Sequence, residues 1–170
     1  MNASQIHLAL THVPVILSFV GLVILVISFF KKNETTTRIA FYILLAAGLF
    51  AIPVYATGEG TEEVVEKLPG VSEAIIEKHE DIAAISMIII LLGGTIALAG
   101  LLLRKFPVVS KMIKFASLFI ALASAVAMAQ TAHLGGQIRH SEIRSGFLTQ
   151  NDSAPEDGTQ NSGTNEEDDD

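Results

Sequence analysis

The stretch VPVILSFVGLVILVISFF, residues 13–30, contains no charged side chain and decides the class of fold. A transmembrane helix needs about 20 mostly apolar residues to cross about 30 Å of hydrocarbon. The basic pair Lys31 and Lys32 follows this stretch. Because the basic pair does not precede the apolar run, and no small-residue cleavage site follows it, we interpret the segment as a retained membrane span and not as a signal peptide.

Three further stretches have the same character, so four spans are predicted. Hydrophobic residues make up 50% of the chain and charged residues only 17%. The spans are expected at roughly residues 7–30, 39–57, 82–103 and 108–134. We therefore predict an all-α fold, a four-helix transmembrane bundle over residues 1–144 with a short outer helical connection. Residues 145–170 are rich in Asp, Glu, Gly, Ser, Thr, Asn and Gln, and we predict a disordered acidic C-terminal tail there.

The basic residues are concentrated in the first and third connections between the spans. Of the 11 Lys and Arg residues, these connections hold Lys31, Lys32, Arg38, Arg104, Lys105, Lys111 and Lys114. By the positive-inside rule, both connections face the cytoplasm, which leaves both termini and the second connection outside. The expected location is the bacterial inner membrane, with the lipid bilayer as the main partner. Nothing resembles a basic patch for nucleic acid.

The outer connection, residues 58–80, is predicted to contain its own helices. Thr61 is a candidate N-cap for a first short helix, which Pro69 and Gly70 end. Ser72 is a candidate N-cap for a second helix that continues into the third span. His79 is expected on the apolar face of that second helix.

All five histidines are expected on the outer side of the membrane. They are His7, His12, His79, His133 and His140. Imidazole is a ligand for haem iron, copper and zinc. A haem b needs two histidines on facing helices, whereas a zinc or copper ion needs three or four ligands. The chain has no cysteine, which excludes thiolate metal sites and covalently attached c-type haem.

Helical geometry ranks these candidates. His7 and His12 would lie about 140° apart on one continuous helix, so they are not expected to bind the same small ion. His79 and His133 are the first choice as haem ligands, because they belong to facing helices near the outer surface, and His12 comes next.

The glycine pair that follows His133 is expected to interrupt the fourth helix. Gly135 and Gly136 permit an unusual turn, or let a flat macrocycle approach the backbone. With such an interruption, His133 and His140 would not share a helix face. Arg139 and Arg144 are candidates for neutralising haem propionates, or for anchoring the helix end among lipid headgroups.

Four short motifs resemble those of a known family. HLALTHVP (residues 7–14) and TGEG (57–60) are similar to motifs in domain-of-unknown-function family 2231, a group of bacterial four-span membrane proteins. KHEDIA (78–83) and AHLGGQIRH (132–140) are similar to its other two motifs. The resemblance covers roughly residues 5–145. It implies that the family's recurring histidines correspond to His7, His12, His79, His133 and His140. Fusion of some members to cytochrome c domains implies haem and electron transfer.

Three functional hypotheses follow. The first is a haem b protein for electron transfer, expected to be a non-catalytic carrier or accessory subunit, with a redox partner or quinone. The second is a copper or zinc site without haem in a sensor or transport accessory, using His12, His79 and His133. The third is a structural subunit of a membrane complex, in which the histidines are interfacial polar groups. No hydrolase motif is present.

Overall fold

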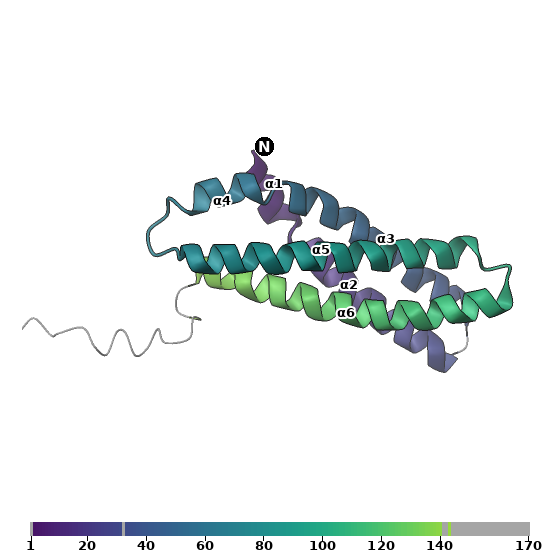
Figure 1. Ribbon diagram of the computed structural model, residues 1–170. Helices are drawn as coiled ribbons and strands as arrows, with labels where there is room; N and C mark the ends of the chain where they lie inside the picture. Colours follow the sequence, from purple (N-terminus) through teal and green to yellow (C-terminus); the bar gives the residue numbers. More distant parts are fainter. Residues whose placement is uncertain (1, 32, 141–142, 144–170) are drawn as a thin grey trace, which may run out of the picture.

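The computed structural model describes residues 2–31, 33–140 and 143, and these residues form six helices and no strands. The helices are α1 (Ala3–Leu10), α2 (His12–Lys31), α3 (Glu34–Ala56), α4 (Glu59–Val65), α5 (Glu73–Leu102) and α6 (Pro107–Arg139) (Figure 1). The predicted all-α four-helix bundle is confirmed. The predicted tail, residues 145–170, and Arg144 lie outside the described residues.

The four long helical segments form a closed ring in which neighbours run antiparallel. Helix α2 packs on α3, α3 on α5, α5 on α6, and α6 on α2. The segment from α1 through α2, and the helices α3, α5 and α6, are each long and apolar enough to cross a membrane. The chain therefore has the architecture of a multi-pass membrane protein, as predicted.

The first predicted span is divided into two helices at Thr11. Helix α1, which carries His7, ends at Leu10, and α2 begins at His12. Pro14 has no N–H to donate, and its ring crowds the carbonyl four residues earlier, which is that of Leu10. The helix is therefore interrupted where Pro14 removes its hydrogen bond. The angle of about 140° expected between His7 and His12 was derived for a continuous helix and stays a prediction.

Many of the buried side chains inside the bundle are small, although a few such as Phe41 are large, and many large apolar side chains are exposed on its outside. Ala40, Ala47, Ala97 and Ala121 are buried, whereas Phe119 is 71% exposed. Lipid tails are as apolar as a protein core, so packing in a bilayer depends on close backbone approach more than on hiding large side chains. This distribution is the one expected for helices surrounded by lipid.

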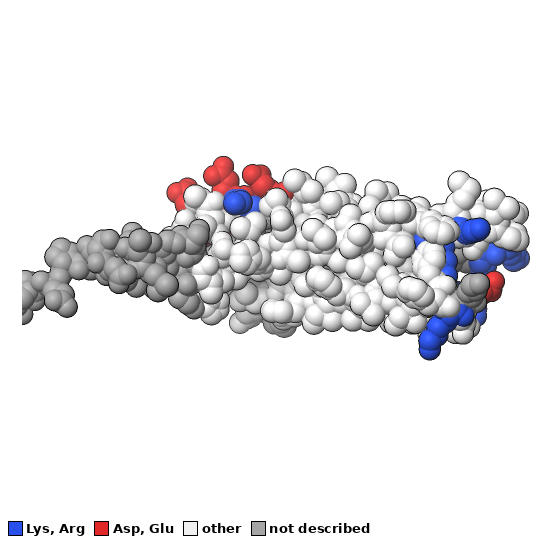
Figure 2. All heavy atoms as spheres, turned by 90° about the horizontal axis from the view of Figure 1, so that it is seen from below, with Lys and Arg blue, Asp and Glu red and all other residues white. Residues whose placement is uncertain are grey.

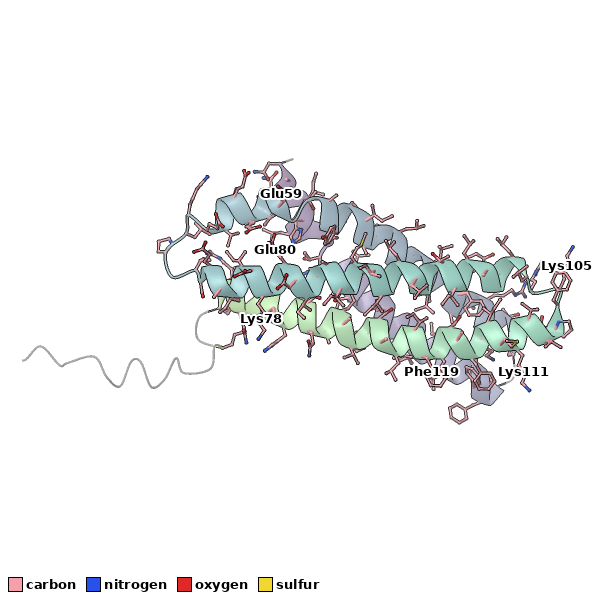
Figure 3. The ribbon with its side chains drawn as sticks, in the orientation of Figure 1. Glu59, Lys78, Glu80, Lys105, Lys111 and Phe119 are labelled. Carbon is pink, nitrogen blue, oxygen red and sulfur yellow. The ribbon has the colours of Figure 1, made fainter. Side chains whose placement is uncertain are left out.

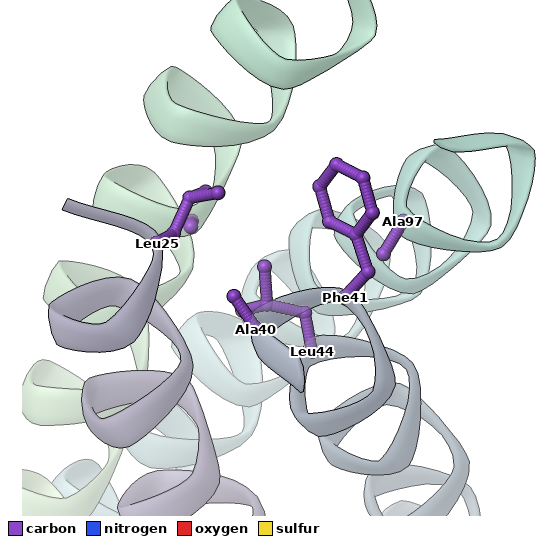
Figure 4. Close-up of a cluster of buried hydrophobic side chains, with 6 residues drawn as sticks. Leu25, Ala40, Phe41, Leu44 and Ala97 are labelled. Atoms are coloured by element: carbon purple, nitrogen blue, oxygen red, sulfur yellow. The ribbon is translucent and has the colours of Figure 1, made fainter. Parts of the chain in front are cut away.

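Helices α3 and α5 approach each other closely at a glycine on each helix. A Cβ added to Gly48 would lie 3.3 Å from the carbonyl oxygen of Ile90 and 3.7 Å from the Cα of Gly94. Nearer the other end of the same pair, the ring of Phe41 occupies the space beside Gly100. Phe41 also belongs to the buried cluster drawn in Figure 4. Glycine is needed at these positions because any side chain would push the two helices apart.

The outer connection differs in detail from the prediction. Helix α4 begins at Glu59 with Gly58 at its N-cap, so the prediction of Thr61 as N-cap is wrong. The hydroxyl of Thr61 donates to the carbonyl of Thr57, 2.8 Å away. Thr61 is therefore inside the first turns of a helix that starts earlier. Ser72 occupies the N-cap position of α5, as predicted.

The two ends of the bundle carry opposite charge. Figure 2 shows Lys and Arg gathered at one end and Asp and Glu at the other. Lys105 and Lys111 mark the basic end, and Glu59 and Glu80 mark the acidic end (Figure 3). Helix α6 already begins at Pro107, so Lys111 and Lys114 belong to its first turns. The ammonium group of Lys114 donates to the carbonyl of Ser28, 3.1 Å away, and lies 4.4 Å from the centre of a phenylalanine ring.

The α3–α5 contact predicts the effect of one matched pair of substitutions. Gly48→Val is expected to lower the free energy of unfolding by about 1–3 kcal/mol, because the new side chain meets the backbone of α5. Leu49→Val, on the lipid-facing neighbour, is expected to change it by less than about 0.5 kcal/mol. Unfolding in mixed micelles, followed by circular dichroism, measures both. Equal effects of the two substitutions would contradict the proposed packing.

Candidate functional site

His7 fixes helix α1 to the end of helix α3. Its Nδ1 lies 2.9 Å from the carbonyl oxygen of Val54 and 3.5 Å from the hydroxyl of Thr57. Val54 is in the last turn of α3, and its carbonyl also accepts from the backbone N–H of Thr57, 3.3 Å away, and from the Thr57 hydroxyl, 3.1 Å away. Because a carbonyl only accepts, the Nδ1 of His7 carries the proton and donates it. The hydroxyl of Ser4 donates to the carbonyl of Gly60, 3.3 Å away, and holds α1 at a second point.

His79 makes the same type of contact between α5 and α6. Its Nδ1 lies 3.1 Å from the carbonyl oxygen of Thr131, so here too Nδ1–H donates. Gly135 is one helical turn after Thr131 and lies on the same face. A Cβ on Gly135 would be only 3.2 Å from Cε1 of the His79 ring. Glycine at this position therefore opens the α6 backbone to the imidazole.

The glycine pair does not interrupt the helix. Helix α6 continues through Gly135 and Gly136 to Arg139, so the expected interruption is wrong. A glycine inside a helix costs about 1 kcal/mol relative to alanine, which is small beside the packing of a long helix on two neighbours. The ring of His79 lies against Gly135 in this structure, and the close approach of a flat macrocycle stays a prediction.

His7 and His79 form what we call the carbonyl-anchored pair. In each neutral ring, the proton is on Nδ1 and the lone pair is on Nε2. Metal-binding histidines commonly donate their second ring N–H to a backbone carbonyl, which fixes the tautomer and the ring orientation. A charge on His7 lowers the pKa of His79. Each ring has the tautomer expected of a metal- or haem-binding histidine.

Burial favours the neutral form of His79. It lowers the pKa of this imidazole below the ordinary 6.5, and the charge of His7 lowers it further, while the bond to Thr131 opposes both. His79 precedes the apolar part of α5, which begins at Ile82. Because the folded protein keeps His79 neutral, its Nε2 lone pair is available to a ligand near neutral pH.

The remaining predicted residues are at the surface. His12 is exposed, with its Nδ1 3.4 Å from the Thr11 hydroxyl. His133 is exposed, and its Nε2 lies 2.9 Å from the amide nitrogen of Gln137, which can only donate. Arg139 and His140 are exposed at the end of α6.

The three-histidine metal site is not assembled in the described residues. Within residues 2–31, 33–140 and 143, no three His, Cys, Asp or Glu side chains lie where they could hold a metal ion together. This includes His12, His79 and His133, the set expected for copper or zinc. The histidine whose charge acts on His79 is His7. The sequence ranking instead pairs His79 with His133.

Acidic residues lie beside the carbonyl-anchored pair along the chain. Glu80 follows His79, and its side chain forms a hydrogen bond with Glu62 of α4, which is the largest cause that raises the pKa of Glu62. Burial and the negative charges of Glu80 and Glu63 raise it further. The carboxyl groups of Glu62 on α4 and Glu80 on α5 therefore interact at this end of the bundle.

Two hydrogen bonds of the site could not be predicted from the sequence pattern. Thr131 and Ser86 bond to each other across α5 and α6, 2.8 Å apart, and Thr131 also carries the carbonyl that anchors His79. Ser and Thr are common in membrane helices, so neither residue is distinctive. The seven-residue spacing of His79 and Ser86, two helical turns, is the one feature that could have indicated a shared partner.

No protein-family model, curated protein or solved structure matches this chain. The resemblance to domain-of-unknown-function family 2231 therefore stays a prediction. The fold and the site define the class only as a multi-pass membrane protein with two anchored histidines at its acidic end.

The Gly135 contact predicts a change in the titration of His79. In the unaltered protein, the pKa of His79 is expected below 6.5. Gly135→Ala is expected to raise it, because the new methyl group moves the ring out of its buried place. Gly136→Ala is the control, since its Cβ would meet only Ile143, at an ordinary 3.7 Å. NMR titration of the histidine ring signals measures both, and identical curves for the two variants would refute this role of Gly135.

Proposed function

We propose that this protein is a bacterial inner-membrane electron-transfer protein that binds haem b through His7 and His79 at its outer end. The proposal keeps His79 from the sequence ranking and substitutes His7 for His133. It does not require catalysis by the chain. The lipid bilayer is its solvent, and a redox protein or quinone is its expected electron partner.

The observation that carries the proposal is that the two rings share one tautomer. Both donate Nδ1–H to a main-chain carbonyl, at 2.9 Å for His7 and 3.1 Å for His79. Each therefore keeps an Nε2 lone pair, which is the donor that haem iron takes. Two such rings are enough for a haem, whereas a zinc or copper site needs three or four ligands. The pair therefore favours haem over a bare ion.

The residues around the pair would hold and tune the group. Haem, when bound, supplies one-electron chemistry. The carbonyls of Val54 and Thr131 fix the two imidazoles and make them more basic ligands. Gly135 leaves room for the His79 ring against α6. Arg139, exposed in the last turn of α6, is the candidate partner for a propionate.

The charge asymmetry of the two ends supports the proposed orientation. Basic residues gather where α2 meets α3 and where α5 meets α6, and acidic residues gather at the other end. The positive-inside rule assigns the basic end to the cytoplasm. His7, His79 and the N-terminus then face outward.

A structural role is the second candidate, and the same hydrogen bonds favour it. His7 ties α1 to α3, and His79 ties α5 to α6, so both rings would stabilise the fold without any ligand. In that case the protein is a subunit of a membrane complex. Spectroscopy of the purified protein separates the two candidates.

The haem proposal predicts which histidines matter. Full-length protein produced with ample haem is expected to show a Soret band and a reduced α-band. His7→Gln and His79→Gln are each expected to remove the low-spin spectrum, because each removes one axial ligand. His12→Gln and His140→Gln, at exposed positions, are the matched controls and should leave it intact.

Other outcomes distinguish the alternatives. A colourless wild-type protein overturns the haem proposal, and stable co-purifying subunits would then favour the structural role. Loss of the spectrum in His133→Gln but not in His7→Gln would restore the ligand pair ranked first from the sequence. Copper or zinc found by elemental analysis of colourless protein would point to the bare-ion alternative.

The orientation is testable because the chain has no cysteine of its own. Glu63→Cys in α4 and Lys105→Cys in the α5–α6 connection place one exposed thiol at each end. A membrane-impermeant maleimide added to intact spheroplasts should label Glu63→Cys at once. Lys105→Cys should react only after the membrane is permeabilised. The opposite pattern would reverse the proposed topology.

A further inference from the structure

Thr131 of α6 contacts α5 in two ways at once. Its carbonyl oxygen accepts from the Nδ1 of His79, 3.1 Å away. Its hydroxyl lies 2.8 Å from the hydroxyl of Ser86. The Thr131 hydroxyl donates to the carbonyl of Ala127, 3.0 Å away, so the Ser86 hydroxyl is the donor in the bond between the two side chains.

The spacing of the two α5 residues makes these contacts interdependent. His79 and Ser86 are seven residues apart, so they lie two turns apart on nearly the same face of α5. Because both meet one residue of α6, sliding either helix along the other by a single turn would break both contacts. The side-chain bond therefore fixes the axial register in which the carbonyl faces the imidazole.

The Ser86 hydroxyl is enclosed. Ser86 is 0% exposed, so no lipid headgroup or bulk water reaches it in this arrangement. A polar group buried among apolar helices is costly unless it is hydrogen-bonded, and such bonds hold membrane helices in register. Ser18 is equally buried, yet its hydroxyl donates to the carbonyl of Pro14 on its own helix, 2.7 Å away. Of these two serines, only Ser86 connects two helices.

The geometry points to Thr131 as a positioning residue for His79: its hydrogen bond with Ser86 sets the α5–α6 register that keeps the His79 proton on Nδ1 and the lone pair on Nε2. This inference deepens the proposed function and rests on it for the identity of the ligand. The arrangement of the ring is a property of the chain alone, so it can be measured without haem.

The test reads the tautomer of His79 in haem-free, full-length protein. With ¹⁵N-labelled histidine in micelles at a pH above the His79 titration, the nitrogen shifts distinguish the protonated ring nitrogen from the one with the lone pair. The His79 signals are those lost in His79→Gln. In the unaltered protein, the proton is expected on Nδ1. In Ser86→Ala and in Thr131→Val, the Nδ1–H form is expected to lose its majority to the Nε2–H form.

Two further variants make the result specific. Ser18→Ala removes an equally buried hydroxyl that connects no helices, and should leave the His79 signals unchanged. Thr131→Ser keeps the hydroxyl and should therefore show the Nδ1–H form of His79, as the unaltered protein does. The inference is overturned if Ser86→Ala or Thr131→Val keeps the wild-type tautomer, or if Thr131→Ser behaves like Thr131→Val. Because the tautomer is read without haem, a colourless protein would refute the proposed function and leave this result standing.

Discussion

A backbone carbonyl in a lipid bilayer must find a hydrogen-bond donor within the protein, and this constraint governs both the fold and the site. Helices satisfy it along their length, so the apolar chain becomes a bundle of helices. At a helix end, such as the last turn of α3, donors come from outside the regular helix pattern, and the carbonyl of Val54 accepts from Thr57 and from His7. The carbonyl of Thr131, within α6, accepts a second donor from His79. Two histidines are thereby fixed in the same tautomer by the backbone itself.

The small interior residues bring the helices close enough for these bonds to form. Glycine at positions 48 and 94 lets α3 and α5 approach, and glycine at 135 lets the His79 ring reach the backbone of α6. Polar contacts between helices then select one register, as the bond between Ser86 and Thr131 does for α5 and α6. The contacts between the helices therefore also determine where the histidine rings lie at the acidic end.

The spans could be predicted from the sequence because hydrophobic length and charge placement depend only on local composition. The relation between the histidines could not, because it depends on the rotation of each helix against its neighbours. Pro14 separates His7 from His12 by interrupting the helix between α1 and α2. The unbroken course of α6 through residues 135 and 136 turns Gly135, not His133, toward His79. From the sequence, the glycine pair predicts a break in the fourth helix. In the structure, Gly135 instead lets the His79 ring of α5 lie against α6.

The central proposal is that His7 of α1 and His79 of α5 would together hold one haem. The low-temperature electron paramagnetic resonance spectrum of the oxidised, haem-loaded, full-length protein tests it most directly, because the spectrum reports the spin state and axial ligands of ferric iron. The account predicts a low-spin ferric signal of the type given by two imidazole ligands. A purely high-spin ferric signal, or the absence of any haem iron signal, would contradict it.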